Sequence, residues 1–175
     1  MQSISSDSLA IDRRARLKIP TADLTYRPPE ERVCDFGDSV IPLTAEQAMI
    51  EASRCIHCPD PAACVKACPA HNDIPSAMWL IEEGRFLEAA KIYRETSSFP
   101  EICGRVCPHE QLCNGSCVRS KVNEPVLTGA LEAFVADYER AMGAVEIPVG
   151  EPTGKRVAIV GAGPAGMACA EQLVQ

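Results

Sequence analysis

Aromatic side chains are scarce in this chain: its 175 residues include four Phe, three Tyr and one Trp. Because aromatic side chains bury the most area each, the sequence has little material for a large core. Hydrophobic residues still make up 46% of it, which permits one domain, or one domain with part of another. A bound cofactor that joins several segments would make up the deficit.

The sequence also lacks a long apolar run and an excess of positive charge. No stretch approaches the roughly 20 apolar residues that a membrane span requires, and the N-terminus has no signal-peptide pattern. The net charge is −7 with a pI near 5.0, whereas nucleic-acid binding needs a basic face. We therefore expect a cytoplasmic protein with no nucleic-acid or membrane partner. The one basic run, residues 13–18, is interpreted as a solvated or locally paired arm.

Cysteine, by contrast, is abundant, with ten residues in the chain. In a reducing compartment so many thiols point to metal binding or redox chemistry more than to disulfides. Most of them fall into two runs. The first is Cys55-x2-Cys58-x5-Cys64-x3-Cys68-Pro69, and the second is Cys107-Pro108-x4-Cys113-x3-Cys117, with Cys103 four residues upstream.

Two kinds of metal site compete for these runs. Zinc takes four thiolates, usually from two short pairs separated by a longer loop. Two consecutive runs with a Cys-Pro step are closer to the two-cluster ferredoxin pattern, in which the fourth cysteine of a run binds the other cluster. The longer x5 gap excludes a simple copy of that fold. The spacing therefore favours two iron–sulfur clusters over zinc.

The spacing leaves two ligand assignments open. In the uncrossed assignment each run holds one cluster, and Cys103 belongs to the second. In the crossed assignment Cys68 binds the second cluster and Cys117 the first. If Cys103 is then an ordinary buried thiol, the second cluster needs a fourth ligand. Glu132, on the helix after the second run, is a candidate, although a helical glutamate most simply faces solvent.

The other cysteines and the histidines receive simpler interpretations. Cys34, Cys103 and Cys169 are most simply small buried hydrophobes. We expect the histidines near the runs to form hydrogen bonds to the clusters or to shield them from solvent, in preference to binding metal. Their positions beside the ligands would let them tune the reduction potentials of the clusters. These histidines are His57, His71 and His109.

Changes in composition, with proline, glycine and helix-capping residues at the boundaries, divide the chain into four parts. Residues 1–43 are rich in proline and suit an extended N-terminal arm. Residues 44–142 carry the cysteine runs and the expected helices, and residues 143–154 are a Gly- and Pro-rich linker. The helices are predicted from a capping box at Thr44, from Asp73 and Gly84 as boundaries, and from apolar stripes that start at Phe86 and Leu127.

The fourth part, residues 155–175, begins as a dinucleotide-binding unit. An apolar strand at residues 156–160 leads into a glycine fingerprint made by Gly161, Gly163 and Gly166. We expect the truncated start of a Rossmann-like FAD/NAD(P)-binding domain. Because one β–α unit has no sheet to join, we expect this part to be disordered, docked on the helical domain or paired with another copy.

Longer stretches around both runs resemble the N-terminal iron–sulfur domain of the glutamate synthase small (beta) chain. They are residues 55–58, 64–75, 99–108 and 112–117. The same domain is shared by dihydropyrimidine dehydrogenase and the large subunit of the NADPH–ferredoxin transhydrogenase. The resemblance extends over residues 20–175 and implies a mainly α, alpha-helical ferredoxin-type domain with two 4Fe–4S clusters.

The resemblance also implies crossed ligands. Cys55, Cys58, Cys64 and Cys117 would hold the first cluster, and Cys68, Cys107, Cys113 and an oxygen of Glu132 the second. In the family the glycine fingerprint binds FAD, and a second domain downstream binds NADPH. Neither cofactor site is complete in this chain.

The function that the resemblance implies is electron transfer. In such a parent, a hydride passes from NADPH to FAD, and electrons cross the clusters to a large subunit that makes glutamate from 2-oxoglutarate and glutamine-derived ammonia. The chain itself would hold no catalytic residue and would be a fragment of this oxidoreductase. One alternative is a subunit-docking module with structural iron–sulfur or zinc. Another is the same module in a pyrimidine-reducing or transhydrogenase parent.

Overall fold

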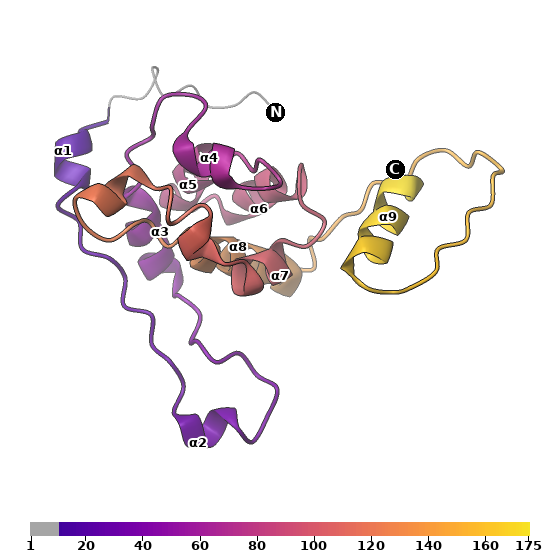
Figure 1. The fold of residues 1–175 in the computed structure, drawn as a ribbon, viewed down its shortest axis with the longest axis horizontal. Coiled ribbons are helices and arrows are strands. Elements are labelled where there is room, and N and C mark those ends of the chain that lie inside the picture. The colour runs from indigo at the N-terminus through magenta and orange to yellow at the C-terminus, as the bar shows by residue number, and fades with distance from the viewer. Residues whose placement is uncertain (1–10) are drawn as a thin grey trace.

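Helices are the only regular elements in the computed structural model of the chain, which describes residues 11–175. In chain order they are α1 (Arg13–Arg16), α2 (Pro29–Arg32), α3 (Ala45–Ser53), α4 (Ala63–Ala67), α5 (Ile74–Glu82), α6 (Phe86–Arg94), α7 (Pro100–Val106), the 3₁₀ turns η2 (His109–Gln111) and η3 (Val118–Lys121), α8 (Thr128–Ala141) and α9 (Pro164–Val174). The prediction of a mainly α chain is confirmed. Figure 1 shows a central helical body from which an N-terminal arm and α9 project.

The first helix of the body begins at the predicted capping box. The Thr44 backbone N–H donates to the Gln47 side-chain oxygen at 2.9 Å, and the Gln47 backbone N–H donates to Thr44 Oγ1 at 3.2 Å. These bonds satisfy amides that the first turn of a helix leaves free. α3 then ends at its C-cap Arg54, so Cys55 directly follows a helix end, as predicted.

α5 and α6 form the predicted helical hairpin between the two cysteine runs. The Asp73 carboxylate accepts a hydrogen bond from the Ser76 backbone N–H at 3.2 Å, and Pro75 occupies the first turn of α5. Gly84 joins the two helices with φ at +73°, a left-handed conformation that costs glycine little because it has no Cβ. The hairpin supplies most of the buried apolar residues of the body.

The core lies where α3, α5, α6 and α8 meet. Phe86 contacts both Phe134 and Tyr138 edge-on, with ring centroids 5.1 Å apart in each case, which is a favoured arrangement of aromatic rings. This aromatic cluster joins α6 to α8. The buried apolar residues of the core are Leu43, Ala48, Ala52, Ile74, Ala77, Met78, Leu80, Ile81, Phe86, Ala89, Ala90, Ile92, Tyr93, Cys113, Val126, Leu131 and Val135.

α7 approaches α8 closely at Gly104. A Cβ added to Gly104 would lie 2.5 Å from the backbone nitrogen of Ala133 and 2.8 Å from the carbonyl oxygen of Gly129. Real Cβ atoms do not approach backbone so closely, so the contact requires glycine. α7 leads directly to Cys107 and α8 carries Glu132, so this contact sets the separation of two predicted ligands.

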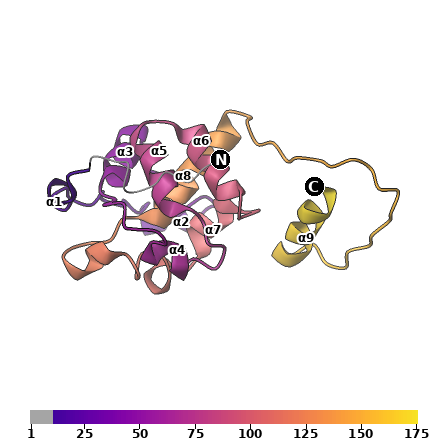
Figure 2. The same cartoon turned by 90° about the horizontal axis from the view of Figure 1, so that it is seen from above.

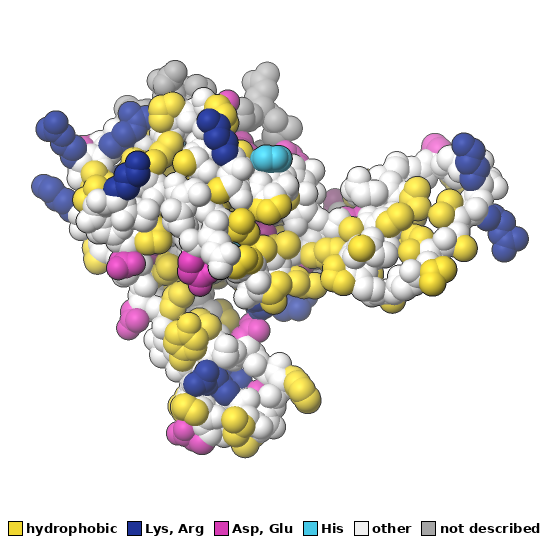
Figure 3. All heavy atoms as spheres, viewed as in Figure 1, with side chains coloured by type: hydrophobic (Ala, Val, Ile, Leu, Met, Phe, Trp, Pro, Cys, Tyr) yellow, Lys and Arg dark blue, Asp and Glu magenta, His cyan; other side chains and the backbone are white. Residues whose placement is uncertain are grey.

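Residues 11–43 form an arm that starts against the body and projects from it at α2 (Figure 1). Tyr26 and Val40 form an isolated antiparallel bridge, and the Arg27 guanidinium pairs with Asp35 at 2.6 Å. Hydrophobic side chains are visible on this projection in Figure 3. Two one-turn helices therefore interrupt the arm that the prolines predicted. The part of that prediction covering residues 1–10 lies outside the described residues, and the domain boundaries stay predictions.

The prediction of a strand at residues 156–160 is wrong, because these residues form no strand in the structure. A strand needs a hydrogen-bonded neighbour, and residues 11–175 contain no other strand for it to join. The helix that should follow the glycine fingerprint does form, as α9. α9 buries no residue and lies to one side of the helical body in both views (Figures 1 and 2).

Over residues 11–175, no helix combines the length and the apolar character that crossing a bilayer requires.

The close contact between α7 and α8 predicts that Gly104→Ala destabilises the body. A new Cβ must push the two helices apart, and overpacking of this kind costs about 1–3 kcal/mol. Urea denaturation followed by circular dichroism would measure the loss. Val106→Ala, at a largely exposed position of the same helix, should change the free energy of unfolding by less than about 0.5 kcal/mol. Equal stability of the two variants would contradict this account of the contact.

Candidate metal centres

The first of two cysteine-lined pockets lies beside the C-terminal end of α3. Cys55 and Cys58 are in the loop after that helix, Cys64 is in α4, and Cys117 directly precedes η3. Apart from these thiols, Ser116 and Arg119, the lining is apolar. The full lining consists of Cys55, Ile56, Cys58, Ala62, Ala63, Cys64, Pro75, Ser116, Cys117, Val118, Arg119 and Val126.

The second pocket lies between the ends of α4 and α7 and the first turns of α8. Cys68 caps α4, Cys107 caps α7, and Glu132 comes from α8. Polar side chains are more numerous here than in the first pocket. The full lining consists of Cys68, Pro69, Ala70, Asn72, Ile74, Ser97, Cys103, Cys107, His109, Leu112, Cys113, Thr128 and Glu132.

Each pocket is lined by cysteines of both runs. Cys117, from the second run, joins the first pocket, and Cys68, from the first run, joins the second. This grouping is that of the crossed assignment, and it brings all eight predicted ligands to one pocket or the other. Cys103 also lines the second pocket and is only partly buried, so the prediction of a buried thiol is not met in full.

Two further cysteine predictions are wrong. Cys34 and Cys169 are exposed and not buried, because they lie on the projecting arm and on α9, where no second layer covers them. All ten cysteines are free thiols, so the structure contains no disulfide among them.

The surroundings of the thiols oppose their ionisation. Burial raises the pKa of Cys55 to about 12, with added repulsion from Cys58 and Cys117. In the second pocket burial raises the pKa values of Cys107 and Cys113 to about 11. Since metals bind the thiolate, these sulfurs deprotonate only where a cation compensates their charge. The sites are therefore built for thiolates that a metal neutralises.

Glu132 is the carboxylate of the second pocket, and it does not face solvent as a helical glutamate most simply would. Its side chain is 5% exposed. Burial, with the charge of Glu101 adding to it, raises the Glu132 pKa to about 8. Its Oε1 atom is buried and has no hydrogen-bond partner. A buried acceptor of this kind costs free energy unless something outside the protein satisfies it, and a metal cluster would do so.

The spacing of the sulfurs bears on which metal fits. Among residues 11–175, no three His, Cys, Asp or Glu side chains lie close enough together to bind a single ion. The four thiols of the first pocket instead surround an open space. A tetrahedral zinc would need sulfurs about 2.3 Å from one centre, whereas a four-iron cluster separates its ligands. The residues present therefore fit a cluster better than zinc.

The three histidines have different positions. His109 lines the second pocket, whereas His57 and His71 line neither pocket. His57 lies between two first-pocket cysteines with φ at +46°, and its ring meets Trp79 edge-on with centroids 5.7 Å apart. Burial, with the charges of Arg16 and Arg13 adding to it, lowers the His57 pKa to about 4. His57 is thus a neutral, buried ring beside the first cysteine loop.

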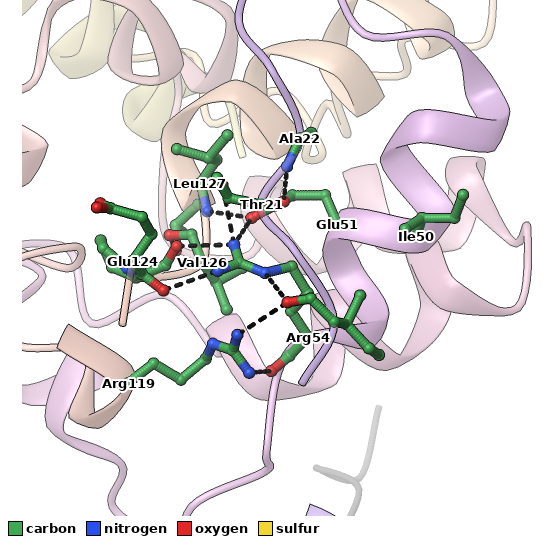
Figure 4. Close-up of polar contacts among 12 residues, drawn as sticks. Thr21, Ala22, Ile50, Glu51, Arg54, Arg119, Glu124, Val126 and Leu127 are labelled. Carbon is green, nitrogen blue, oxygen red and sulfur yellow. Dashed lines mark hydrogen bonds and ion pairs between the residues drawn. The ribbon is translucent and has the colours of Figure 1, made fainter. Parts of the chain in front are cut away.

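A buried ion pair behind the first pocket fastens the arm to the body. The carboxylate of Glu51 pairs with the guanidinium of Arg54, and both side chains are almost fully buried. Glu51 accepts backbone N–H bonds from Ala22 at 2.8 Å and from Leu127 at 2.9 Å. Arg54 donates to the Pro125 carbonyl at 2.8 Å. Figure 4 shows this network joining the arm, α3 and the segment before α8.

The basic run of the arm is not merely solvated. The Arg13 guanidinium donates to the carbonyl oxygens of Ile56 and His57 at 3.0 and 3.1 Å. Arg16 donates to the carbonyl of Cys55 at 3.0 Å and pairs with a carboxylate of α5 at 2.8 Å. The arm therefore holds the cysteine loop of the first pocket in place. The composition of the run gave no signal of this, because the acceptors are backbone carbonyls.

The backbone of the glycine fingerprint depends on glycine at two of its three positions. Gly161 has φ at +103°, in the region that favours glycine. A Cβ on Gly166 would lie 2.1 Å from the Gly161 carbonyl oxygen, so α9 packs directly on the turn. A Cβ on Gly163 would meet nothing within 4 Å, which leaves the approach to the α9 N-terminus open.

These features define an iron–sulfur electron-transfer domain. Comparison with known proteins agrees: residues 32–144 match the family described as dihydropyrimidine dehydrogenase domain II, 4Fe-4S cluster. The chain belongs to this family, which includes the N-terminal iron–sulfur domain of the glutamate synthase small chain.

Three of the similar proteins represent two kinds of oxidoreductase. The chain is 41% identical over 87% of its length to the glutamate synthase [NADPH] small chain of Halomonas elongata, and 39% identical over 91% to that of Escherichia coli K12. It is 40% identical over 76% of its length to the NAD-dependent dihydropyrimidine dehydrogenase subunit PreT of E. coli K12. The matched regions are 32%, 34% and 32% of these relatives, so the chain spans about a third of their length.

The buried ion pair predicts a large effect of Glu51→Gln. The substitution leaves the Arg54 charge buried without a counter-charge, and breaking a buried pair on one side costs about 3–5 kcal/mol. Urea denaturation should show this loss. Glu88→Gln removes the partner of Arg85 in an exposed pair and should leave the free energy of unfolding almost unchanged, because exposed ion pairs are weak. Similar losses in the two variants would contradict the role assigned to Glu51.

Proposed function

We propose that the chain is the electron-transfer module of an NADPH-dependent oxidoreductase and carries two 4Fe–4S clusters. The observation that supports this most is the pair of separate pockets, each lined by thiols of both cysteine runs. Membership of the 4Fe–4S family supports the type of cluster. A single cluster or a single zinc would leave one set of buried thiols without a cation.

The lining of the two pockets supports the crossed ligand set. The first cluster is held by Cys55, Cys58, Cys64 and Cys117. The second is held by Cys68, Cys107, Cys113 and Glu132.

Glu132 is preferred to Cys103 as the fourth ligand of the second cluster. The sulfur of Cys103 already shares a hydrogen bond with Ser97 Oγ at 3.8 Å, whereas Glu132 Oε1 is buried and has no partner. A buried carboxylate is stabilised as an anion only by a nearby positive charge, which bound iron supplies. A harder oxygen ligand also distinguishes the potential of the second cluster from that of the all-thiolate first cluster.

Bound clusters would act as one-electron carriers. The protein would determine where they lie and how far they are exposed to water. The apolar lining of the first pocket excludes solvent on that side. Arg13 and Arg16 fix the first cysteine loop through its carbonyls. The contact at Gly104 sets the distance between α7 and α8, and with it the position of Cys107 relative to Glu132. In this proposal the role of these residues is to position the clusters, and none of them makes or breaks a substrate bond.

The glycine fingerprint connects the module to its electron source. Gly161, Gly163 and Gly166 would bind the pyrophosphate of FAD at the α9 N-terminus once the remaining strands of a Rossmann-like domain are present. The open space at Gly163 and the close packing at Gly166 fit that use. Electrons would enter through such a flavin, which NADPH reduces, and we place the protein in the cytoplasm, where its free thiols stay reduced.

The acceptor is assigned to a large subunit of the glutamate synthase type. Small chains of this enzyme match the chain at 41% and 39% identity. A dihydropyrimidine dehydrogenase subunit matches at 40% identity, because the shared segment is the module and not the acceptor site. Electron transfer to a purified glutamate synthase large subunit, tested beside a pyrimidine-reducing partner, distinguishes the two parents.

Metal analysis tests the proposed function directly. Protein purified without oxygen should contain about eight irons and eight sulfides per chain and should bleach on reduction, as two 4Fe–4S clusters require. A colourless protein with about two zincs per chain would instead identify a structural docking module. Removal of iron by a chelator should unfold the cysteine-rich segments, because metal binding contributes to their folding free energy.

The fourth ligand of the second cluster has its own test. Glu132→Ala should remove about half of the iron, since the second cluster loses a ligand while the first keeps its own four. Cys103→Ser changes a neighbouring side chain of the same pocket and should leave the iron content intact. Iron and sulfide assays with electron paramagnetic resonance (EPR) spectra provide the readout. Loss of iron in Cys103→Ser with retention in Glu132→Ala would assign Cys103 as the ligand.

A further inference from the structure

Within residues 11–175, one buried arginine at the first pocket forms no ion pair with an acidic side chain. Arg119 is 1% exposed, lies two residues after Cys117 and is among the residues that line the pocket. It was not singled out by the sequence, because a lone arginine beyond a cysteine run has no motif.

The hydrogen bonds of Arg119 all go to neutral acceptors. Its Nη1 atom donates to the carbonyls of Arg16 at 2.8 Å and Arg54 at 3.1 Å, and its Nη2 atom donates to the carbonyl of Ile19 at 3.3 Å. Its Nε atom is buried and has no partner. Among the described residues, no carboxylate forms an ion pair with this guanidinium. The carbonyls fix its orientation without supplying a counter-charge, and Glu51, which attracts the Arg119 charge, is already paired with Arg54.

The neighbouring Arg54 is a buried arginine whose charge has an acidic partner. It is equally buried, yet it pairs with Glu51 (Figure 4). An unpaired buried charge is costly, so proteins retain one where an anion is bound. Four thiolates around a cluster form such an anion, and the thiols that line the pocket with Arg119 are its four predicted ligands.

The second pocket has no such cation. No Lys or Arg is among its lining residues. Because the carboxylate of Glu132 takes the place of a fourth thiolate there, the two ligand sets carry the same formal charge, and the pockets differ in local charge by the Arg119 cation at the first. Reduction of a cluster adds one negative charge, so a nearby cation favours the reduced state and raises the potential, and an anion lowers it.

We propose that Arg119 is the counter-charge of the first cluster, that its Nε–H donates to a sulfur there, and that it raises the potential of the first cluster above that of the second. This inference rests on the proposed function. Its consequence is an ordered transfer: the reduced second cluster loses one electron, the oxidised first cluster gains it, and no proton or bond changes place. Arg119 is thus a positioning residue that sets the direction of electron flow within the module.

The test is an anaerobic redox titration monitored by EPR on wild-type protein, Arg119→Gln and Arg119→Lys. The second cluster is assigned with Glu132→Ala, which alters that cluster alone. In Arg119→Gln the ratio of reduced to oxidised first cluster at a fixed ambient potential should fall at least tenfold. A tenfold change in this ratio corresponds to a shift of about 59 mV for a one-electron couple. Arg119→Lys keeps the charge and should shift the ratio less.

Two controls separate charge from structure. The second cluster of the same molecule should keep its potential. Arg140→Gln removes a positive charge at an exposed site of α8 and should leave both potentials unchanged. Loss of the first cluster in Arg119→Gln but not in Arg119→Lys would support the need for a positive charge.

Three results would overturn the inference. They are an unshifted first cluster in Arg119→Gln, equal shifts of both clusters, and loss of the first cluster in both Arg119 variants, since lysine retains the charge. A wild-type protein without reducible clusters would instead overturn the proposed function, and the inference with it. The two failures are therefore distinguished by the wild-type titration alone.

Discussion

The gathering of cysteine thiols that resist ionisation into two pockets is the constraint on which this structure depends. The pKa values of Cys55, Cys107 and Cys113 lie well above that of a free thiol because burial opposes the thiolate. Such thiols ionise only with a cation between them. Since each pocket draws thiols from both runs, a bound cluster would join segments far apart in the chain. The metal would then contribute stability to a core in which aromatic side chains are few.

The rest of the helical body positions these segments. The hairpin of α5 and α6 fills the core, and α7 and α8 approach each other through Gly104. The arm closes the other side, where Arg13 and Arg16 bond to carbonyls of the first cysteine loop. A segment that composition marks as a polar extension is therefore part of the first site. Its contribution lies in directed hydrogen bonds to backbone, which sequence patterns do not reveal.

Local signals predicted the helices well, and long-range contacts were less predictable. The capping box at Thr44 and the boundary at Asp73 depend on bonds within one turn, so they are readable from sequence. The burial of Glu132 and Arg119 depends on distant elements: the spacing offered Glu132 only as a candidate that most simply faces solvent, until the family resemblance favoured it as a ligand. The strand at residues 156–160 failed for the same reason, because pairing needs a partner strand that residues 11–175 do not contain. Propensity alone does not make a sheet.

The claim most open to direct measurement is that the two runs interlock through shared clusters. Crystals grown without oxygen, with anomalous diffraction recorded at the iron edge, would locate the metal atoms. The account predicts two separate iron clusters, one bound by sulfurs that include Cys117 and the other by Cys68, Cys107, Cys113 and the carboxylate of Glu132. Two clusters each bound by cysteines of a single run, or isolated metal atoms in place of clusters, would contradict it.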